Sequence, residues 1–267
     1  MNNKAKRDII ILLIVIILVG GVLTYTQEVP PIYVVASESM EHSANWTWGT
    51  INAGDIVLVK RAPDPVKNVI TYVVGRETGY STYGEFGNVI LYHGPGKIII
   101  HRAIFYLTWN NSHPVVQGYT NQSWITVTQS YVLIKDVGFS HRNLLVMING
   151  FHNESGFITV GDFNLAFRGV YNQSLNAYQA ADQYFLGISP VTPSEVVGVA
   201  HGQIPWFGLI KLNIMKLYGD WPYSNEVPNH AYEYLFASII IIVALGLFPY
   251  GKVYRKATGK KSKRNEK

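Results

Sequence analysis

The sequence contains no cysteine among its 267 residues, so disulfide bonds, thiolate nucleophiles and cysteine-bound metals are excluded. The eight histidines show no His-x-x-x-His spacing, and few of them have an acidic residue nearby in the sequence, which argues against a histidine-built metal site. Charged residues are also scarce, at 15% of the chain against 48% hydrophobic residues. We therefore expect no metal, and a chain rich in buried or membrane-facing surface.

The positive charge is concentrated at the two ends of the chain. The net charge is +5, but residues 1–25 and 231–267 together hold 11 basic and 3 acidic residues, whereas the middle holds 11 basic and 14 acidic. A nucleic-acid-binding domain needs a basic face on folded structure, so we expect no nucleic-acid partner. The tails could be solvated and disordered, but each adjoins an apolar run, which favours a membrane setting.

Two apolar runs predict membrane anchors. Residues 9–25 carry no charge and have the length of a short membrane-spanning helix. A cleaved signal peptide is the alternative, but no small-x-small cleavage site follows, so we favour an uncleaved anchor. Residues 232–250 have tyrosines at both ends and predict a second span, with a buried or interfacial helix as the alternative. The positive-inside rule then gives a multi-pass protein of the cell membrane, with the tails 1–8 and 251–267 in the cytoplasm and residues 26–231 outside.

The segment 26–231 reads as short strands between Gly/Pro turns, including predicted strands at 33–36, 69–74, 88–92 and 98–106. Within it, 108–156 predicts an inserted β-rich lobe, and 164–181 a loop or short helix. The expected fold class is mainly β, in a barrel or sandwich. Five Asn-x-Ser/Thr sequons also fall in this segment, as expected for an extracytoplasmic glycoprotein: Asn45, Asn110, Asn121, Asn153 and Asn172.

Three short motifs carry candidate chemistry. Ser37-Glu38-Ser39-Met40 follows an apolar strand, Ile99-Ile100-His101-Arg102 lies on a second strand, and Gly161-Asp162-x-Asn164 follows a third. Serine-based hydrolysis needs a hydroxyl, a general base within hydrogen-bond reach and donors for the oxyanion. Ser39 can supply the hydroxyl and His101 the base, because imidazole accepts a proton near neutral pH.

In this order, behind an apolar anchor, the motifs resemble the type I signal peptidases of the archaeal and endoplasmic-reticulum branch, which use histidine where the bacterial branch uses lysine. The resemblance spans most of residues 9–210, interrupted by insertions. It implies a signal-peptidase-like β-barrel or sandwich catalytic domain, a serine endopeptidase that removes signal peptides from exported preproteins, and no cofactor. It also implies Ser39 as nucleophile, His101 as base, and the Ser39 amide with the Ser37 hydroxyl as oxyanion donors. Glu38 stands where the family has glycine.

The carboxylate that orients His101 is where the sequence departs most from the family, which has one aspartate in the Gly-Asp box and a second soon afterwards. Here Asp162 occupies the box, and the next acidic residue is Asp182. The segment that trails the family's second aspartate follows Asp182, as Gly187-Ile188-Ser189-Pro190-Val191. We therefore predict an insertion within 165–181, Asp182 as the residue that orients His101, and Asp162 as a structural acceptor.

Several alternatives stay open. Lys60 or Lys97 could serve as a bacterial-type lysine base. His42 is a further candidate base, but it lies three residues after Ser39 on the same turn, where reaching the Ser39 hydroxyl is awkward. Trp46 and Trp48 could lie in the membrane interface or pack on the core. The chain could also be a non-catalytic, membrane-anchored surface protein, or a related Ser/His peptidase with a narrower processing task. The partners implied by the resemblance are signal peptides of secretory and membrane preproteins and membrane lipid, with the translocation machinery as a further candidate.

Overall fold

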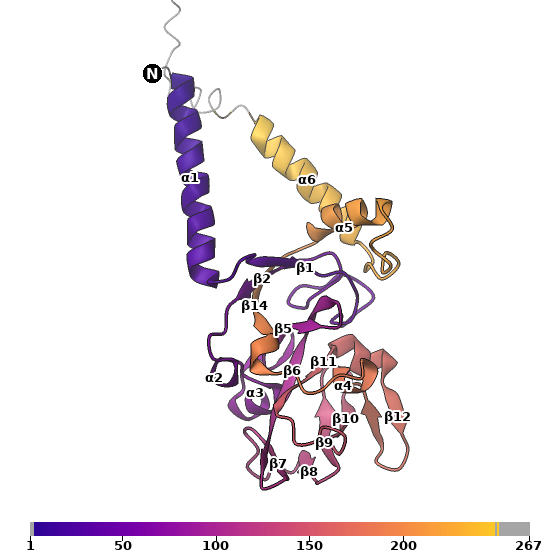
Figure 1. The fold of residues 1–267 in the computed structure, drawn as a ribbon. Coiled ribbons are helices and arrows are strands. Elements are labelled where there is room, and N and C mark those ends of the chain that lie inside the picture. Colours follow the sequence, from indigo (N-terminus) through magenta and orange to yellow (C-terminus); the bar gives the residue numbers. More distant parts are fainter. Residues whose placement is uncertain (1–2, 249, 251–267) are drawn as a thin grey trace, which may run out of the picture.

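The computed structural model describes residues 3–248 and 250, and it is a mainly β domain with two apolar helices at one end (Figure 1). The strands are β1 (Ile32–Val34), β2 (Ile56–Lys60), β3 (Ser81–Thr82), β4 (Glu85–Phe86), β5 (Val89–Gly94), β6 (Lys97–Asn110), β7 (His113–Val116), β8 (Ile125–Val127), β9 (Tyr131–Val137), β10 (Arg142–Met147), β11 (Gly156–Val160), β12 (Val170–Asn172), β13 (Ala177–Gln179) and β14 (Val196–Ile204). The helices are α1 (Asn3–Thr26), α2 (Pro65–Asn68), α3 (Tyr72–Thr78), α4 (Asp182–Phe185), α5 (Gly208–Leu217) and α6 (Ala231–Leu247), with the π-helix η1 (Asn164–Arg168) and the 3-10 helix η2 (Pro193–Glu195).

The larger sheet has seven strands in the order β1-β2-β14-β5-β6-β11, and β7 pairs with the far end of β6. All its pairings are antiparallel. Among the described residues no strand pairing joins β1 to β11, so the sheet is open; of the barrel or sandwich that the sequence predicted, the closed barrel is not found. β6 is long because Ile98 to Leu107 supply an almost unbroken run of apolar residues that is covered on both faces.

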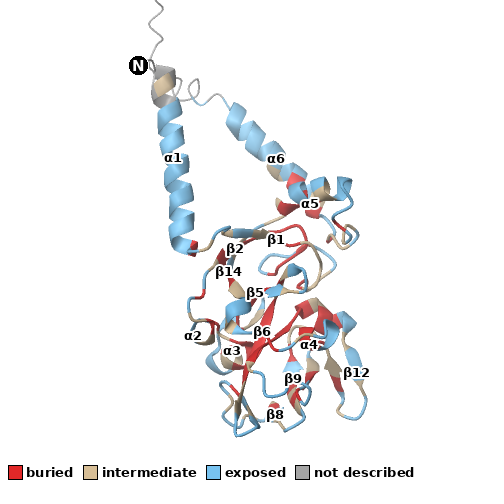
Figure 2. Cartoon of the chain, viewed as in Figure 1, coloured by how far each residue is buried: buried red, intermediate tan, exposed pale blue. Residues whose placement is uncertain are grey.

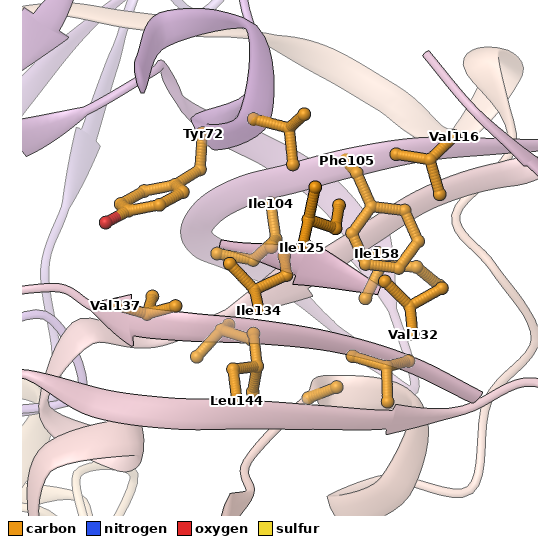
Figure 3. Packing of buried hydrophobic residues seen from close by; sticks show 14 of the residues in the cluster. Tyr72, Ile104, Phe105, Val116, Ile125, Val132, Ile134, Val137, Leu144 and Ile158 are labelled. Atoms are coloured by element: carbon orange, nitrogen blue, oxygen red, sulfur yellow. The ribbon is translucent and has the colours of Figure 1, made fainter. Parts of the chain in front are cut away.

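The second sheet packs against the first and gives a sandwich-like core. Its order is β12-β13-β10-β9-β8, with one parallel pairing, Leu144 opposite Tyr178. Figure 3 shows Ile134 and Leu144 of this sheet facing Ile104 and Phe105 of β6, with Tyr72 of α3 at the margin. Burial of this apolar surface, at about 25 cal/mol per Å², holds the two sheets together.

The predicted lobe at 108–156 corresponds to only part of this second sheet. Strands β8, β9 and β10 come from the predicted range, whereas β12 and β13 come from 170–179, where a loop or short helix was predicted. That prediction was wrong because the hairpin is held by pairing of β13 with β10, a contact distant in sequence. The predicted strand at 69–74 was also wrong: Thr71 accepts a hydrogen bond from the Val74 N–H, and Gly79 ends helix α3 in the left-handed conformation.

The two apolar helices differ in length. Within α1, 19 residues from Asp8 to Thr26 are long and apolar enough to cross a membrane. Helix α6 has 17 residues and is apolar apart from Glu233 in its first turn, but it falls short of that length within the described part of the chain. Both helices lie at the same end of the molecule, and Figure 2 shows their surfaces as mostly exposed. The predicted basic tail 251–267 lies outside the described residues.

Candidate active site

His101 and Asp182 form a buried pair. His101 lies on β6, and Asp182 is the first residue of α4, which follows the β12–β13 hairpin. The His101 Nδ1 lies 2.7 Å from Asp182 Oδ2 and 2.8 Å from Oδ1. The Tyr92 and Thr159 hydroxyls donate to the same Oδ2, over 2.8 and 2.6 Å. These donors fix the carboxylate against the imidazole, and burial together with the Asp182 charge raises the pKa of Tyr92, which keeps the phenol protonated.

Ser39 lies in the turn after β1 and faces the same cavity as this pair. The cavity has a volume of about 260 Å³, and its lining includes Ser37, Ser39, His101 and Asp182. The Ser37 hydroxyl donates toward the Ser39 Oγ over 3.5 Å, at the outer limit of a hydrogen bond. The Ser39 N–H has no hydrogen-bond partner within the described residues, so it can donate to a bound group.

Gly161 explains how the Ser39 turn and His101 approach each other. A Cβ at this position would lie 2.5 Å from the Ser39 carbonyl oxygen and 2.9 Å from the His101 Nε2. Such distances are clashes, so the site requires glycine here for space rather than for backbone conformation. The Phe163 N–H then donates to the Ser39 carbonyl over 3.1 Å and anchors the turn to the Gly161–Asn164 loop.

Asp162 has other partners than His101. It receives the buried Arg102 guanidinium, with Nη2 2.7 Å from Oδ2 and Nε 2.9 Å from Oδ1, and the His42 Nε2 at 2.9 Å. Although burial alone raises the pKa of Asp162, Arg102 and His42 lower it to about 2, so the carboxylate is ionised. His42 stacks on Phe139, with ring centroids 4.3 Å apart. The His42 imidazole is therefore hydrogen-bonded to Asp162. This network joins β6, the residues after Ser39 and the loop after β11.

Comparison with known proteins adds no relative: no family model, curated protein or solved structure matches this chain.

An ionic cluster beside the serine was not predicted from the sequence. Arg168 of η1 contacts Glu38 Oε1 at 2.5 Å and Glu226 Oε1 at 3.2 Å, and Glu226 Oε2 accepts the Glu38 N–H over 3.1 Å. Nearby, the Trp221 indole donates to the Ala36 carbonyl over 2.8 Å. These contacts tie the α5–α6 connection to the turn that carries Ser39. The unusual Glu38 was the one sequence signal, but its partners are 130 and 188 residues away.

Two further polar residues line the cavity. The Asn164 Oδ1 is buried and has no hydrogen-bond partner among the residues that the structure describes, and an unpaired buried acceptor is costly unless a ligand or water satisfies it. Lys97 lies on the cavity wall, where its Nζ is 3.3 Å from the Tyr223 hydroxyl. Lys60, the other candidate lysine base, lies over the Tyr25 ring at 4.9 Å and is not among the cavity residues. The described residues contain no cluster of three His, Cys, Asp or Glu residues that could hold a metal.

Glu41, two residues after Ser39, is a buried acid that should make stability depend on pH. Burial raises the pKa of this carboxyl from 4.5 to about 8, although the Ala53 N–H, 2.9 Å from Oε1, opposes the shift. Between these two values the unfolded chain releases the proton while the folded chain retains it, so stability falls as pH rises and stays level above pH 8.

We expect Glu41→Gln to melt several degrees above the wild type at pH 9, because glutamine keeps the acceptor without the buried charge, and to melt at nearly the same temperature at pH 4. Thermal unfolding monitored by circular dichroism across this range tests the expectation, with the exposed Glu77→Gln as the matched control. A difference in melting temperature that is the same at both pH values would contradict the assignment.

Proposed function

We propose that the chain is a membrane-anchored serine endopeptidase of the signal peptidase type, with Ser39 as nucleophile, His101 as general base and Asp182 as the residue that orients the imidazole. One observation carries the proposal: a serine with a free N–H, a histidine and a buried carboxylate from three distant segments border one cavity. The resemblance in the sequence motifs supports the same reaction.

We propose the following chemistry for these residues. His101 Nε2 takes the proton of the Ser39 hydroxyl as its oxygen attacks the scissile carbonyl, and later gives that proton to the leaving amine. Asp182 holds the Nδ1 proton and stabilises the imidazolium that forms. The Ser39 N–H and the Ser37 hydroxyl donate to the developing oxyanion. Hydrolysis of the acyl-enzyme by water, with His101 again as base, completes the cycle.

The substrate would bind as an added strand. Residues 97–101 of β6 pair with β5 along one edge, and β1 pairs with β2 along one edge; neither segment has a second strand partner among the described residues. Both segments border the cavity, together with Phe185 and Leu186. An extended peptide could therefore donate and accept main-chain hydrogen bonds while its side chains enter the cavity. We expect the cavity to accept small side chains next to the bond that is cut, as in signal peptides.

The proposal includes an arrangement in the membrane. Helix α1 anchors the chain, α6 extended to residue 250 forms a second span, and the signal-peptidase-like domain lies outside, with residues 26–231 presented to emerging preproteins. The 11 basic residues of the two ends support this orientation through the positive-inside rule, which counts lysine and arginine close to the spans.

The orientation is testable because a cysteine-free chain allows single labels. We expect Val115→Cys, in the domain, to react with a membrane-impermeant maleimide added to intact cells or right-side-out vesicles, whereas Ser262→Cys in the basic tail reacts only after the membrane is opened. Protease added from outside should likewise remove 26–231 and spare both tails. Labelling of residue 262 in sealed vesicles would mean that the second apolar run does not cross.

The activity is tested directly with a preprotein. The purified full-length protein, reconstituted in lipid vesicles, should release the mature protein at one bond, identified by N-terminal sequencing. A preprotein with bulky residues at the first and third positions before the cut is the matched control. No cleavage of several unrelated preproteins would leave the non-catalytic surface protein as the better interpretation.

A further inference from the structure

We propose that the outer face of helix α5 lies in the headgroup region of the lipid bilayer, so that the cavity is held at the membrane surface. This inference rests on the proposed membrane anchoring. Ile210, Ile214 and Leu217 are spaced by four and three residues, which places them on one face of the helix. Their exposed fractions are 48%, 54% and 85%, and Tyr218, at 78%, continues the strip.

The opposite face of α5 already has its partners. Leu209 and Leu212 are fully buried and belong to an apolar cluster with Trp46, Trp221 and Leu235. The Asn213 Nδ2 donates to the Tyr232 hydroxyl over 3.1 Å and ties α5 to the first turn of α6. Because this inner face alone accounts for the packing of α5 on the domain, folding gives no reason for the outer strip to be apolar.

Lipid is the occupant that the surroundings favour. Helix α5 lies beside the start of α6, at the end of the domain from which both apolar helices extend (Figure 1). Trp48 and Tyr234, which are 69% and 42% exposed, form an aromatic group with Trp46 and Trp206 at this end. Tryptophan and tyrosine are enriched at the depth of lipid headgroups. Lys211 and Lys216 are exposed along α5 and can reach anionic headgroups.

The contacts below α5 give this placement a consequence for the site. The connection from α5 to α6 carries Trp221 and Glu226, which bond to the Ala36 carbonyl and the Glu38 N–H on either side of Ser37. An α5 seated in the headgroups therefore sets the height of the Ser39 turn above the bilayer. The cavity then meets the end of a substrate's apolar segment where that segment leaves the membrane.

The experiment uses single cysteines in the otherwise cysteine-free, full-length chain. Leu217→Cys carries an environment-sensitive fluorophore, with Ile240→Cys in α6 as the membrane reference and Val115→Cys in β7 as the aqueous reference; these two residues are 67% and 43% exposed. The labelled proteins are reconstituted in phosphatidylcholine–phosphatidylglycerol vesicles that contain lipids spin-labelled either near the headgroup or deep in the chain.

We expect the label at 217 to lose at least about half of its fluorescence to the shallow quencher and much less to the deep one, the label at 240 to respond to the deep quencher, and the label at 115 to respond to neither. Quenching at 240 without quenching at 217 would overturn the α5 proposal and leave the anchoring intact. Absence of quenching at both sites would overturn the α6 span and the α5 proposal together. A label at 217 that is shielded from aqueous iodide but not quenched by lipid would indicate a protein partner, such as a second copy, and would also overturn it.

Discussion

Cleavage of a model preprotein is expected to vanish in both Ser39→Ala and His101→Ala. Without the Ser39 hydroxyl no acyl-enzyme forms, and without the imidazole the proposed general base is gone. When two catalytic groups act as a unit, removal of either one abolishes nearly all of the rate enhancement that both provide. The kcat of each variant should therefore fall by at least about 10⁴-fold. Single-turnover cleavage in lipid vesicles, with product read on gels, measures the loss.

The controls separate catalysis from folding. Ser43→Ala, at a partly exposed serine a few residues after Ser39, removes a hydroxyl without touching the proposed site and should keep wild-type activity. A fluorophosphonate probe should label the wild type and leave Ser39→Ala unlabelled, while membrane insertion stays the same. Wild-type turnover by either alanine variant would remove Ser39 and His101 from the mechanism. Activity retained in His101→Lys would indicate a lysine-type base instead.

The sequence was most informative where a local pattern decides the structure. The apolar run at 9–25 predicted a helix of membrane length, and short strands between Gly/Pro turns predicted a mainly β domain; both are confirmed. Placement of Asp182 depended on a short motif that follows it, and the structure brings this residue to His101 although the two are 81 positions apart in the sequence.

The sequence failed where tertiary contacts override local preference. Residues 69–74 have strand-forming side chains, yet the Thr71 cap and packing of Tyr72 against the second sheet favour α3. The hairpin at 170–179 depends on β10 as a neighbour that is distant in the sequence. Whether the sheet closes into a barrel depends on whether its two edge strands come close enough to pair, and no local sequence pattern shows this. The Glu38–Arg168–Glu226 cluster joins three segments, and a sequence alone does not indicate which charges meet.

The two aspartates near the cavity should respond differently to substitution by asparagine. Asp182→Asn keeps the shape of the side chain but removes the charge that holds the His101 Nδ1 proton and stabilises imidazolium. We expect kcat to fall by about 10³–10⁴-fold, as is typical when such a carboxylate is neutralised.

Asp162→Asn should act on stability instead. It leaves the Arg102 guanidinium, which is almost completely buried, without its counterion, and breaking a buried ion pair costs about 3–5 kcal/mol. The guanidinium also donates to the carbonyls of Thr82, Phe86 and Gly87. These hydrogen bonds should reduce the loss of stability and let the variant fold at low temperature. The folded enzyme should then keep most of its kcat.

The comparison is made per folded molecule, with melting temperature and kcat measured on the same samples at about 10 °C. Asp182→Asn should melt close to the wild type or a few degrees below it, and Asp162→Asn should melt far lower. The decisive quantity is kcat per folded molecule, because a structural defect lowers the folded fraction without lowering the turnover of the molecules that do fold. If folded Asp162→Asn lost more turnover than Asp182→Asn, then Asp162 would be the residue that acts on His101 during the reaction, reached through a movement of the Gly161 loop.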